Sequence, residues 1–448
     1  MTHHRRYRWL LLSLALIILL SPLLYWSTGI GQAAAGLSAE ISRQPDGTLL
    51  SSPKAEALHS LSLPMRLQRM LIYPLLLLAF QFSGGAVALR RWLEGKIAGG
   101  QGGRGAGEIK TAEGQRSRGA GVKILLRSSA PLLLCLCFVV LFNLALSLLY
   151  LPFNFYRSFT VGHQFGLSTL TALGWFGDWA KGLLINLGLD GLTWTGLYGL
   201  MRWLPRRWPL PAGVALVLFT GVMVLLEPVL ITPLFYEIRP LEDAQLRARI
   251  LALADRAQMH VNSVEVIDAS AKTTTVNAYF TGFGGAQRIV LYDTLLRDYT
   301  PDQIEVVLAH EMGHWYYQHV LLSIVGIGAA GWLGLFALQW LLNRTWRWLG
   351  LHGPADIAGL PFVLAVFTLV SYLALPVENG ISRFAERQAD HFALTTSQKP
   401  QAVIELFEQF AVQNLSLVEP PAWEKLIFYT HPSLAERIRM AEGREAGQ

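Results

Sequence analysis

Residues 307–319 read VLAHEMGHWYYQH and include the side chains of this chain best suited to do chemistry. His310 and His314 are four residues apart, so on a helix they lie on one face, one turn apart. Glu311 lies beside that face and can reach a water molecule without binding the metal itself. Two histidines and a glutamate base in this spacing are typical of a zinc peptidase that keeps one coordination position for water. The five-residue pattern also occurs by chance, so the alternative is an ordinary helix.

A zinc site of this kind needs a third ligand from the protein. His319 comes five residues after His314. The related pattern with a third histidine needs six residues and an intervening glycine, so we do not expect His319 to bind the metal. Glu386 and Asp390 in SRFAERQAD are better candidates, because they share a helix face as a ligand and a carboxylate that holds a histidine N–H. From spacing alone, a salt-bridged surface helix explains this segment better.

The elements that position these residues include several membrane spans. Of the 448 residues, 52% are hydrophobic and only 15% are charged, which points to a membrane protein. Crossing a hydrocarbon core about 30 Å thick takes roughly 20 helical residues. Seven stretches are long enough and predict a polytopic, mainly α-helical protein: 9–26, 70–89, 129–151, 181–201, 209–235, 320–342 and 359–379.

Three features within these stretches have specific interpretations. The first stretch is followed by GQAAAG, so a cleaved secretory signal is the alternative to a first span. Asp190 lies in the fourth stretch, where a carboxylate is expected to face protein or water. Cys135 and Cys137 lie in the third stretch; they exclude a disulfide framework and are expected to pack in the bundle.

The net charge of +6 follows the predicted topology. Residues 90–128 are Gly-rich and basic, and we expect a flexible loop there. With seven spans, this loop and the other basic flanks fall on one side, which the positive-inside rule assigns to the cytoplasm. The zinc residues would then face the extracytoplasmic side. Since the charge reflects topology, we predict no nucleic-acid partner. The other basic flanks are Arg5–Arg8, Arg202–Arg207 and Arg344–Arg347.

The polar segments predict an α+β domain split by two spans. Residues 237–319 read as a helix, a strand at 261–269, two strands at 276–283 and 287–296 around a glycine turn, and the motif helix. Thr300 before Pro301, with Gln303 three residues on, marks the start of the motif helix, which we expect to run on into the sixth span. Residues 380–448 read as three further helices. The predicted division is 1–236, 237–319, 320–379 and 380–448.

HEMGH, two apolar spans, SRFAERQAD and THPSLAERI occur in this order, which resembles the type I CAAX prenyl protease family of integral-membrane zinc metallopeptidases. VLITPLFYEIRPLED and VNAYFTGFGGAQRIVLYDTLL extend the resemblance, which spans roughly 150–440. It implies a gluzincin-like zinc domain, one Zn²⁺ per chain, a water-filled chamber enclosed by the helices, and seven spans. The implied substrate is a peptide or protein, membrane-associated or lipidated.

The resemblance also implies roles for individual residues. The zinc ligands would be His310, His314 and Glu386; Glu311 would be the general base, and Asp390 would support a zinc histidine. His431 and Arg437 would hold the substrate carbonyl, and Asn277 and Ala278 would pair with the substrate backbone. Without the resemblance, His431 is explained as a capping residue before Pro432 and Arg437 as a solvated helix residue.

The chain departs from the eukaryotic members at its N-terminus and in the long basic loop. A bacterial inner-membrane protease with an extracytoplasmic zinc domain fits these features better, and it would act in membrane protein quality control or processing. The alternative is a transporter or scaffold that has kept the fold and lost catalysis. Metal content separates the two, because a scaffold needs no stoichiometric zinc.

Overall fold

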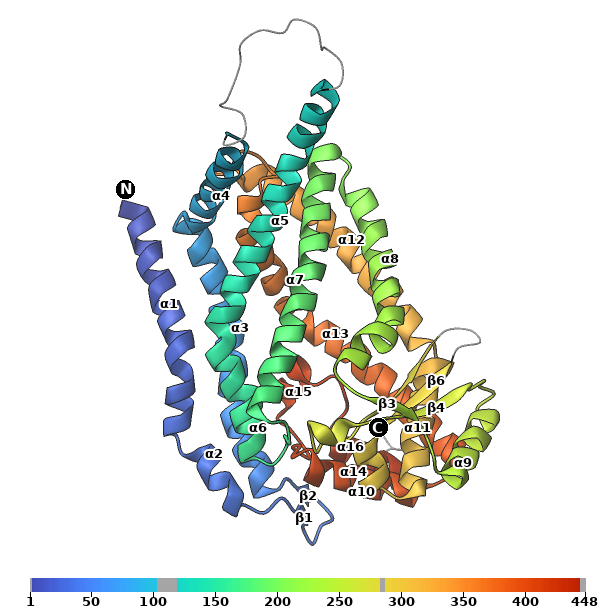
Figure 1. Ribbon diagram of the computed structural model, residues 1–448. Coiled ribbons are helices and arrows are strands. Elements are labelled where there is room, and N and C mark those ends of the chain that lie inside the picture. Colours follow the sequence, from blue (N-terminus) through green and yellow to red (C-terminus); the bar gives the residue numbers. More distant parts are fainter. Residues whose placement is uncertain (1, 103–118, 283–286, 444–448) are drawn as a thin grey trace, which may run out of the picture.

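The computed structural model describes residues 2–102, 119–282 and 287–443. Long helices form a bundle, and one end of the bundle adjoins a small mixed sheet with its own helices (Figure 1). This mainly helical architecture with strands in the polar region confirms the predicted fold class.

Among the described residues, six helical segments are long and apolar enough to cross a membrane. The predicted fourth span, 181–201, lies in α7 (Ala172–Trp203), which packs beside α5 but is not in this set. Glycines, threonines and Asp190 interrupt its apolar residues. The six segments include all or most of α1 (Thr2–Ser27), α3 (Pro53–Phe82), α5 (Gly119–Asn154), α8 (Pro209–Leu226), α12 (His319–Thr345) and α13 (Leu360–Ser397).

The boundary predicted for the second span was wrong. We expected 70–89, but α3 ends at Phe82 and the chain turns at Gly84, which has a φ of +80°. Only glycine adopts this backbone region at little cost, so the turn occurs there. The new helix α4 (Gly85–Gly102) also corrects the predicted loop at 90–128, because α4 and the start of α5 are helical. The remainder of that loop lies outside the described residues.

Tertiary contacts explain why α4 is helical in a Gly-rich sequence. Arg90 on α4 is 2% exposed and forms an ion pair with Asp356 in the turn before α13. Its Nη2 lies 3.0 Å from His352 Nε2. Buried charges are tolerated when paired and hydrogen-bonded, so these contacts fix α4 against the bundle.

The sheet is mixed and has the order β3–β4–β6–β5. The predicted hairpin around the glycine turn is confirmed, because β5 pairs antiparallel with β6. β3 was not predicted, and residues 293–296 of the predicted third strand belong to helix α10. Asp293 starts that helix while its carboxylate accepts hydrogen bonds from Ser270. The strands are β3 (Ile238–Pro240), β4 (Ser263–Ile267), β5 (Ala278–Thr281) and β6 (Arg288–Tyr292).

Helix α11 (Pro301–Tyr316) carries the HEMGH motif and begins where the sequence predicts. Thr300 caps it, and Gln303 completes the capping box. Ile304, Leu308 and Met312 recur every four residues and are at most 2% exposed. Burying each such side chain contributes about 1.5–3 kcal/mol, which fixes the rotation of α11 about its axis. The other helices around this core are α9 (Ala244–Arg256), α10 (Asp293–Asp298), α14 (Pro400–Gln413), α15 (Ala422–Phe428) and α16 (Leu434–Ala441).

Helix α11 does not run on into the sixth span, as we had expected. The chain turns at Gln318, which has the left-handed backbone conformation with φ of +55°, and α12 begins at His319. A residue in this conformation cannot continue a right-handed helix. In contrast, the last span and the SRFAERQAD segment form one helix, α13, of 38 residues with Pro376 inside it.

The two ends of the bundle differ in charge and in content. Figure 1 shows the N-terminus, the start of α5 and the turn between α7 and α8 at one end, and the sheet with α11 and α14 at the other. The turn between α7 and α8 carries Arg206 and Arg207. The basic end and the HEMGH end are therefore opposite.

Candidate active site

His310, His314 and Glu386 converge between α11 and α13. The Nε2 atoms of the two histidines are 3.1 Å apart. Glu386 Oε2 lies 3.2 Å from His310 Nε2, and Glu386 Oε1 lies 3.3 Å from His314 Nε2. One ligand atom from each residue falls within 4.8 Å of the others, so the three can share one metal ion.

The bonding of these side chains fits a cation at their centre. The Nδ1 atoms of His310 and His314 are engaged by Asp390 and His319, so the Nε2 atoms face each other and Glu386. Glu386 is 6% exposed, and its Oε2 has no hydrogen-bond partner of suitable geometry among the described residues. An unsatisfied buried carboxylate oxygen is costly unless it meets a positive charge. Two imidazoles and a carboxylate are a donor set that suits Zn²⁺.

A close approach of the two helices brings the ligands together. Gly313 on α11 faces α13, where a Cβ atom would come within 2.9 Å of the Cα atom of Ala389. A side chain there would push the helices apart. Gly313 of HEMGH therefore lets Glu386 on α13 reach the two histidines.

Asp390 holds His310 from the side away from Glu386. Its Oδ1 lies 2.8 Å from His310 Nδ1. Arg437 on α16 donates from Nε to Asp390 Oδ2 at 2.8 Å and from Nη2 to Oδ1, and its guanidinium stacks 4.1 Å from the ring centroid of Phe407. Asp390 and Arg437 are 3% and 8% exposed. This buried pair fixes the His310 ring so that Nε2 points at the other ligands.

His319 has a place in the site that the sequence did not reveal. Its Nδ1 lies 2.9 Å from His314 Nδ1, and its Nε2 lies 3.1 Å from Gln388 Oε1. His319 therefore contacts the ring nitrogen of His314 that is turned away from the ligand group. We expected it not to be a ligand, and it lies outside the group of residues that can share a metal. The turn at Gln318 places His319 there, and we had not predicted this turn from the sequence.

Glu311 is the carboxylate beside the ligand group that has no partner. It forms no hydrogen bond or ion pair with a residue that the structure describes. Burial raises the pKa of Glu311, although the neighbouring His310 and His314 act in the opposite direction. A general base is most effective when its pKa approaches the working pH, so burial moves Glu311 in the useful direction.

The electrostatics of His310 follow from its two carboxylate neighbours. Burial disfavours its charge, but the neighbouring carboxylates of Asp390 and Glu386 outweigh burial and raise the pKa of His310 to about 9. The metal-free site therefore keeps a proton on His310 at neutral pH. A metal bound at Nε2 would have to displace that proton.

His431 reaches the same site from the loop between α15 and α16. Its Nε2 lies 3.3 Å from Glu386 Oε2, and its side chain is 54% exposed. Two residues of α13 hold this loop, because Asn379 donates to the Ile427 carbonyl and Arg383 donates to the Tyr429 carbonyl, each at 2.6 Å. His431 is thus placed at the ligand group, whereas Arg437 is placed behind His310.

Asn277 and Ala278 lie at the start of β5, the edge strand of the sheet beside α11. The Asn277 carbonyl accepts from the Tyr292 amide at 3.1 Å, which ties this end of β5 to β6. Phe280 on β5 contacts Trp315 on α11, with ring centroids 5.3 Å apart. The structure thus brings an open strand edge next to the motif helix.

Comparisons with known proteins agree with this arrangement. Residues 240–445 match the family model "Peptidase family M48", and residues 65–237 match "CAAX prenyl protease N-terminal, five membrane helices". A metalloprotease of Bacillus subtilis, YhfN, is 32% identical over 312 residues, which are 69% of this chain and 73% of that protein. The chain belongs to peptidase family M48.

Other M48 relatives and a solved structure extend the comparison. CAAX prenyl protease 1 of Saccharomyces cerevisiae is 30% identical over 327 residues, which cover 68% of this chain and 71% of that protein. The crystal structure of S. mikatae Ste24p has a TM-score of 0.68 at 22% identity, and the match covers 96% of this chain and 99% of that chain. This chain therefore shares the Ste24p fold.

These findings establish the class of activity. The protein is a metalloprotease of family M48, an integral membrane hydrolase that acts on peptide or protein substrates in a lipid environment. Its family implies a metal, and the group that can hold one is the triad of His310, His314 and Glu386. Membership of this metalloprotease family argues against the alternative of an inactive scaffold or transporter.

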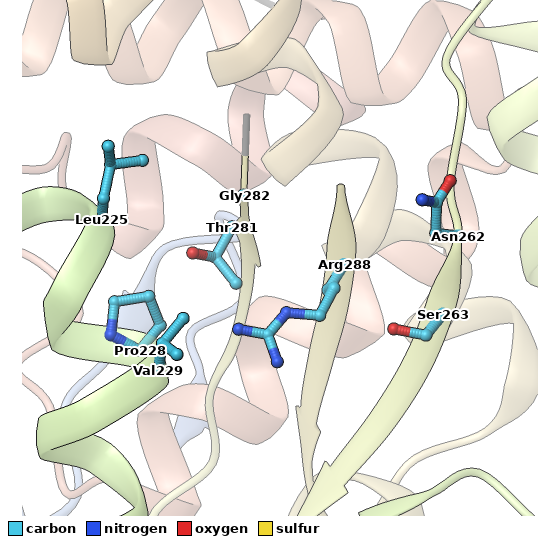
Figure 2. A pocket seen from close by; sticks show the side chains of 8 residues that line it. All are labelled: Leu225, Pro228, Val229, Asn262, Ser263, Thr281, Gly282 and Arg288. Atoms are coloured by element: carbon cyan, nitrogen blue, oxygen red, sulfur yellow. The ribbon is translucent and has the colours of Figure 1, made fainter. Parts of the chain in front are cut away.

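A separate cavity of about 490 Å³ lies away from these residues of the M48 site. Figure 2 shows Leu225, Pro228 and Val229 on one side, with Thr281 of β5 and Arg288 of β6 opposite them. The cavity adjoins the end of β5 opposite Ala278.

Proposed function

We propose that the protein is a zinc-dependent metalloendopeptidase whose zinc ligands are His310, His314 and Glu386. One observation carries this proposal: two imidazole nitrogens and the buried carboxylate of Glu386 converge, and the buried carboxylate of Glu311 is beside them. A single Zn²⁺ per chain suits a site with three protein ligands.

The chain's own residues divide the chemistry among them. A bound zinc ion would lower the pKa of a water molecule to about 7 and polarise the scissile carbonyl. Glu311 accepts a proton from the attacking water on its carboxylate and passes it to the leaving amine. His431 donates a hydrogen bond to the carbonyl oxygen as negative charge develops there; losing such a donor typically costs about 10²–10³ in rate. Asp390 and Arg437 keep His310 oriented.

The substrate backbone binds at the open edge of β5. An extended peptide that adds a strand there is held through its main chain, so affinity does not depend on one sequence. Asn277 and Ala278 are the residues of this edge proposed to pair with it. This mode suits a protease with many substrates, and lipidated or membrane-bound chains are among the substrates we propose.

We further propose that residues 237–319 and 380–448 are two halves of one peptidase domain at the extracytoplasmic face of a bacterial inner membrane. The basic ends of the helices lie opposite the HEMGH end, and the positive-inside rule assigns the basic end to the cytoplasm. The protein would there remove damaged or mislocalised membrane proteins, or process others.

Zinc content and proteolysis, measured on the same samples, test the proposal. Detergent-purified wild type and Glu311→Gln are compared with Glu40→Gln, which changes an exposed glutamate far from the site in sequence. We expect about one zinc per chain in all three and cleavage of an unfolded membrane-tethered reporter by all but Glu311→Gln. Cleavage by Glu311→Gln at the wild-type rate would refute the role of Glu311, and wild type that cleaves without any metal would refute the zinc mechanism.

A further inference from the structure

Arg383 lies in the SRFAERQAD segment, three residues before Glu386, so the two side chains share one face of α13. Unlike Glu386 and Asp390 on the same helix, Arg383 forms no ion pair within the part of the chain that the structure describes. Its Nη1 instead donates to the backbone carbonyls of Lys425 and Tyr429, each at 2.6 Å. Arg383 therefore joins the helix of the proposed ligand Glu386 to the end of α15.

The end of α15 depends on side chains of α13 for its hydrogen bonds. The last carbonyl groups of a helix have no donor within the helix, so they need partners from elsewhere. Arg383 supplies donors to two carbonyls at this end. Asn379, which is 5% exposed, donates to a third, the Ile427 carbonyl, at 2.6 Å. The chain is therefore held in place up to Tyr429.

His431 comes two residues after this anchored stretch and has few contacts of its own. Its side chain is 54% exposed, so packing alone leaves the ring free to rotate. Its Nε2 lies 3.3 Å from Glu386 Oε2. A zinc ion at the ligand group would compete with His431 for that carboxylate, whereas the hydrogen bonds of Arg383 to the loop would persist.

Thr430 contacts the other ring nitrogen of His431. Its Oγ1 lies 2.8 Å from His431 Nδ1. An ionised carboxylate only accepts hydrogen bonds, so His431 Nε2 carries a proton where it faces Glu386. In a neutral imidazole Nδ1 then accepts, and the Thr430 hydroxyl is its donor. The proposed reaction needs the same tautomer, because His431 donates from Nε2 only while that nitrogen carries a proton.

We propose that Arg383 and Thr430 are positioning residues for His431. Arg383 fixes the loop to helix α13, and Thr430 fixes the tautomer and the rotation of the imidazole ring. The inference rests on the proposed peptidase function, in which His431 donates a hydrogen bond to the substrate carbonyl oxygen. A donor that is already aimed at the developing charge needs no reorganisation during the reaction. A misplacement of about 1 Å can cost about 10²-fold in rate.

Steady-state kinetics on a quenched fluorescent peptide that wild type cleaves test the proposal. His431→Ala should lower kcat about 10²–10³-fold, and a residue that acts only through His431 cannot cost more than this. We expect kcat to fall about 10–100-fold in Arg383→Gln through displacement of the loop. Thr430→Val should lower kcat about 3–10-fold, the value of one hydrogen bond. KM should change less than about twofold, because the donor acts mainly in the transition state.

Double variants show whether these effects pass through His431. In the His431→Ala background, Arg383→Gln and Thr430→Val should lower kcat no further, because the side chain that they position is gone. A substitution that merely damages the fold would lower kcat in both backgrounds. Thr430→Ser keeps the hydroxyl, so it should retain the activity that Thr430→Val loses.

Zinc content and melting temperature, measured on the same samples, separate positioning from folding. Arg387→Gln is the matched control, because Arg387 is an exposed arginine on the same helix and forms no ion pair or hydrogen bond with a described residue. It should keep the wild-type kcat, and all variants should hold about one zinc per chain. If Arg383→Gln loses zinc or fails to fold, Thr430→Val decides the proposal, because it changes an exposed side chain and keeps its shape.

An unchanged kcat in both Arg383→Gln and Thr430→Val would overturn the proposal. A loss of kcat that is equally large with and without His431 would do the same, because the two residues would then have a purely structural role. If His431→Ala is as active as wild type, His431 is no oxyanion donor and the proposal fails, while the peptidase function stands. Absence of cleavage by zinc-loaded wild type would refute the peptidase function itself.

Discussion

The buried ion pair of Asp390 and Arg437 leads to a testable prediction about zinc affinity and the stability of the metal-free protein. Asp390→Asn keeps the shape of the side chain but removes the charge that Arg437 meets with two hydrogen bonds. Arg437 is 8% exposed, and its other close contacts are the Phe407 ring and His310 Nδ1, which lies 3.4 Å from Arg437 Nη2. Leaving one member of a buried ion pair without its partner costs about 3–5 kcal/mol, so we expect that loss in the metal-free protein.

The same substitution should weaken metal binding. Without the carboxylate, the His310 ring loses the partner that keeps its Nδ1 occupied and its Nε2 free. Losing such a support typically costs about 10–100-fold in metal affinity. The assay is competition with a zinc chelator, combined with thermal unfolding of metal-free protein in detergent.

A double variant separates the two effects. Asp390→Asn with Arg437→Gln leaves no buried orphan charge, so it should be more stable than Asp390→Asn alone, with a coupling of about 0.5–3 kcal/mol. Its metal affinity should stay low because His310 is still unsupported. An Asp390→Asn protein with unchanged melting temperature and zinc affinity would refute the reasoning, and so would a double variant that merely adds the two single losses.

Three further predictions concern the same helices. Gly313→Ala should push α11 away from α13 at Ala389, lower the free energy of unfolding by about 1–3 kcal/mol and lower zinc affinity. Melting temperature and competition with a zinc chelator measure the two effects, and unchanged values would disprove the close approach of the helices. His319→Ala should weaken zinc binding about 10-fold through His314, with His319→Gln retaining more affinity than His319→Ala. His310 has a raised pKa in the folded state, so its contribution to the stability of the metal-free protein should be fully present just below pH 6.5 and be lost as pH rises through about 9. Zinc affinity should increase over that range. A melting temperature of the metal-free protein that does not change between pH 6.5 and about 9 would contradict this.

Features of the fold that depend on the spacing of nearby residues could be predicted from the sequence. The four-residue separation of His310 and His314 places both on one helix face, and Thr300 with Gln303 marks where that helix begins. The hairpin of β5 and β6 followed from alternation around a glycine turn. These features depend on neighbours in the chain, so a single sequence can reveal them.

Features that depend on distant contacts were not predictable from spacing. Glu386 was indicated by a family resemblance, because nothing local distinguishes it from a surface glutamate. The helical α4 depends on Arg90 meeting Asp356, far away in sequence. The turn at Gln318, which places His319 against His314, requires a left-handed backbone conformation. This conformation is unfavourable for a residue other than glycine, so the local sequence does not predict it.

Helix α13 runs without interruption from an apolar to a polar environment. Its first half has the apolarity of a membrane span, while its second half carries Glu386 and Asp390 to a site formed largely by residues from the polar part of the chain. How the bilayer holds the first half therefore sets the tilt of the second, and with it the distance from Glu386 to the histidines on α11. The thickness of the surrounding lipid thereby becomes part of the geometry of the metal site.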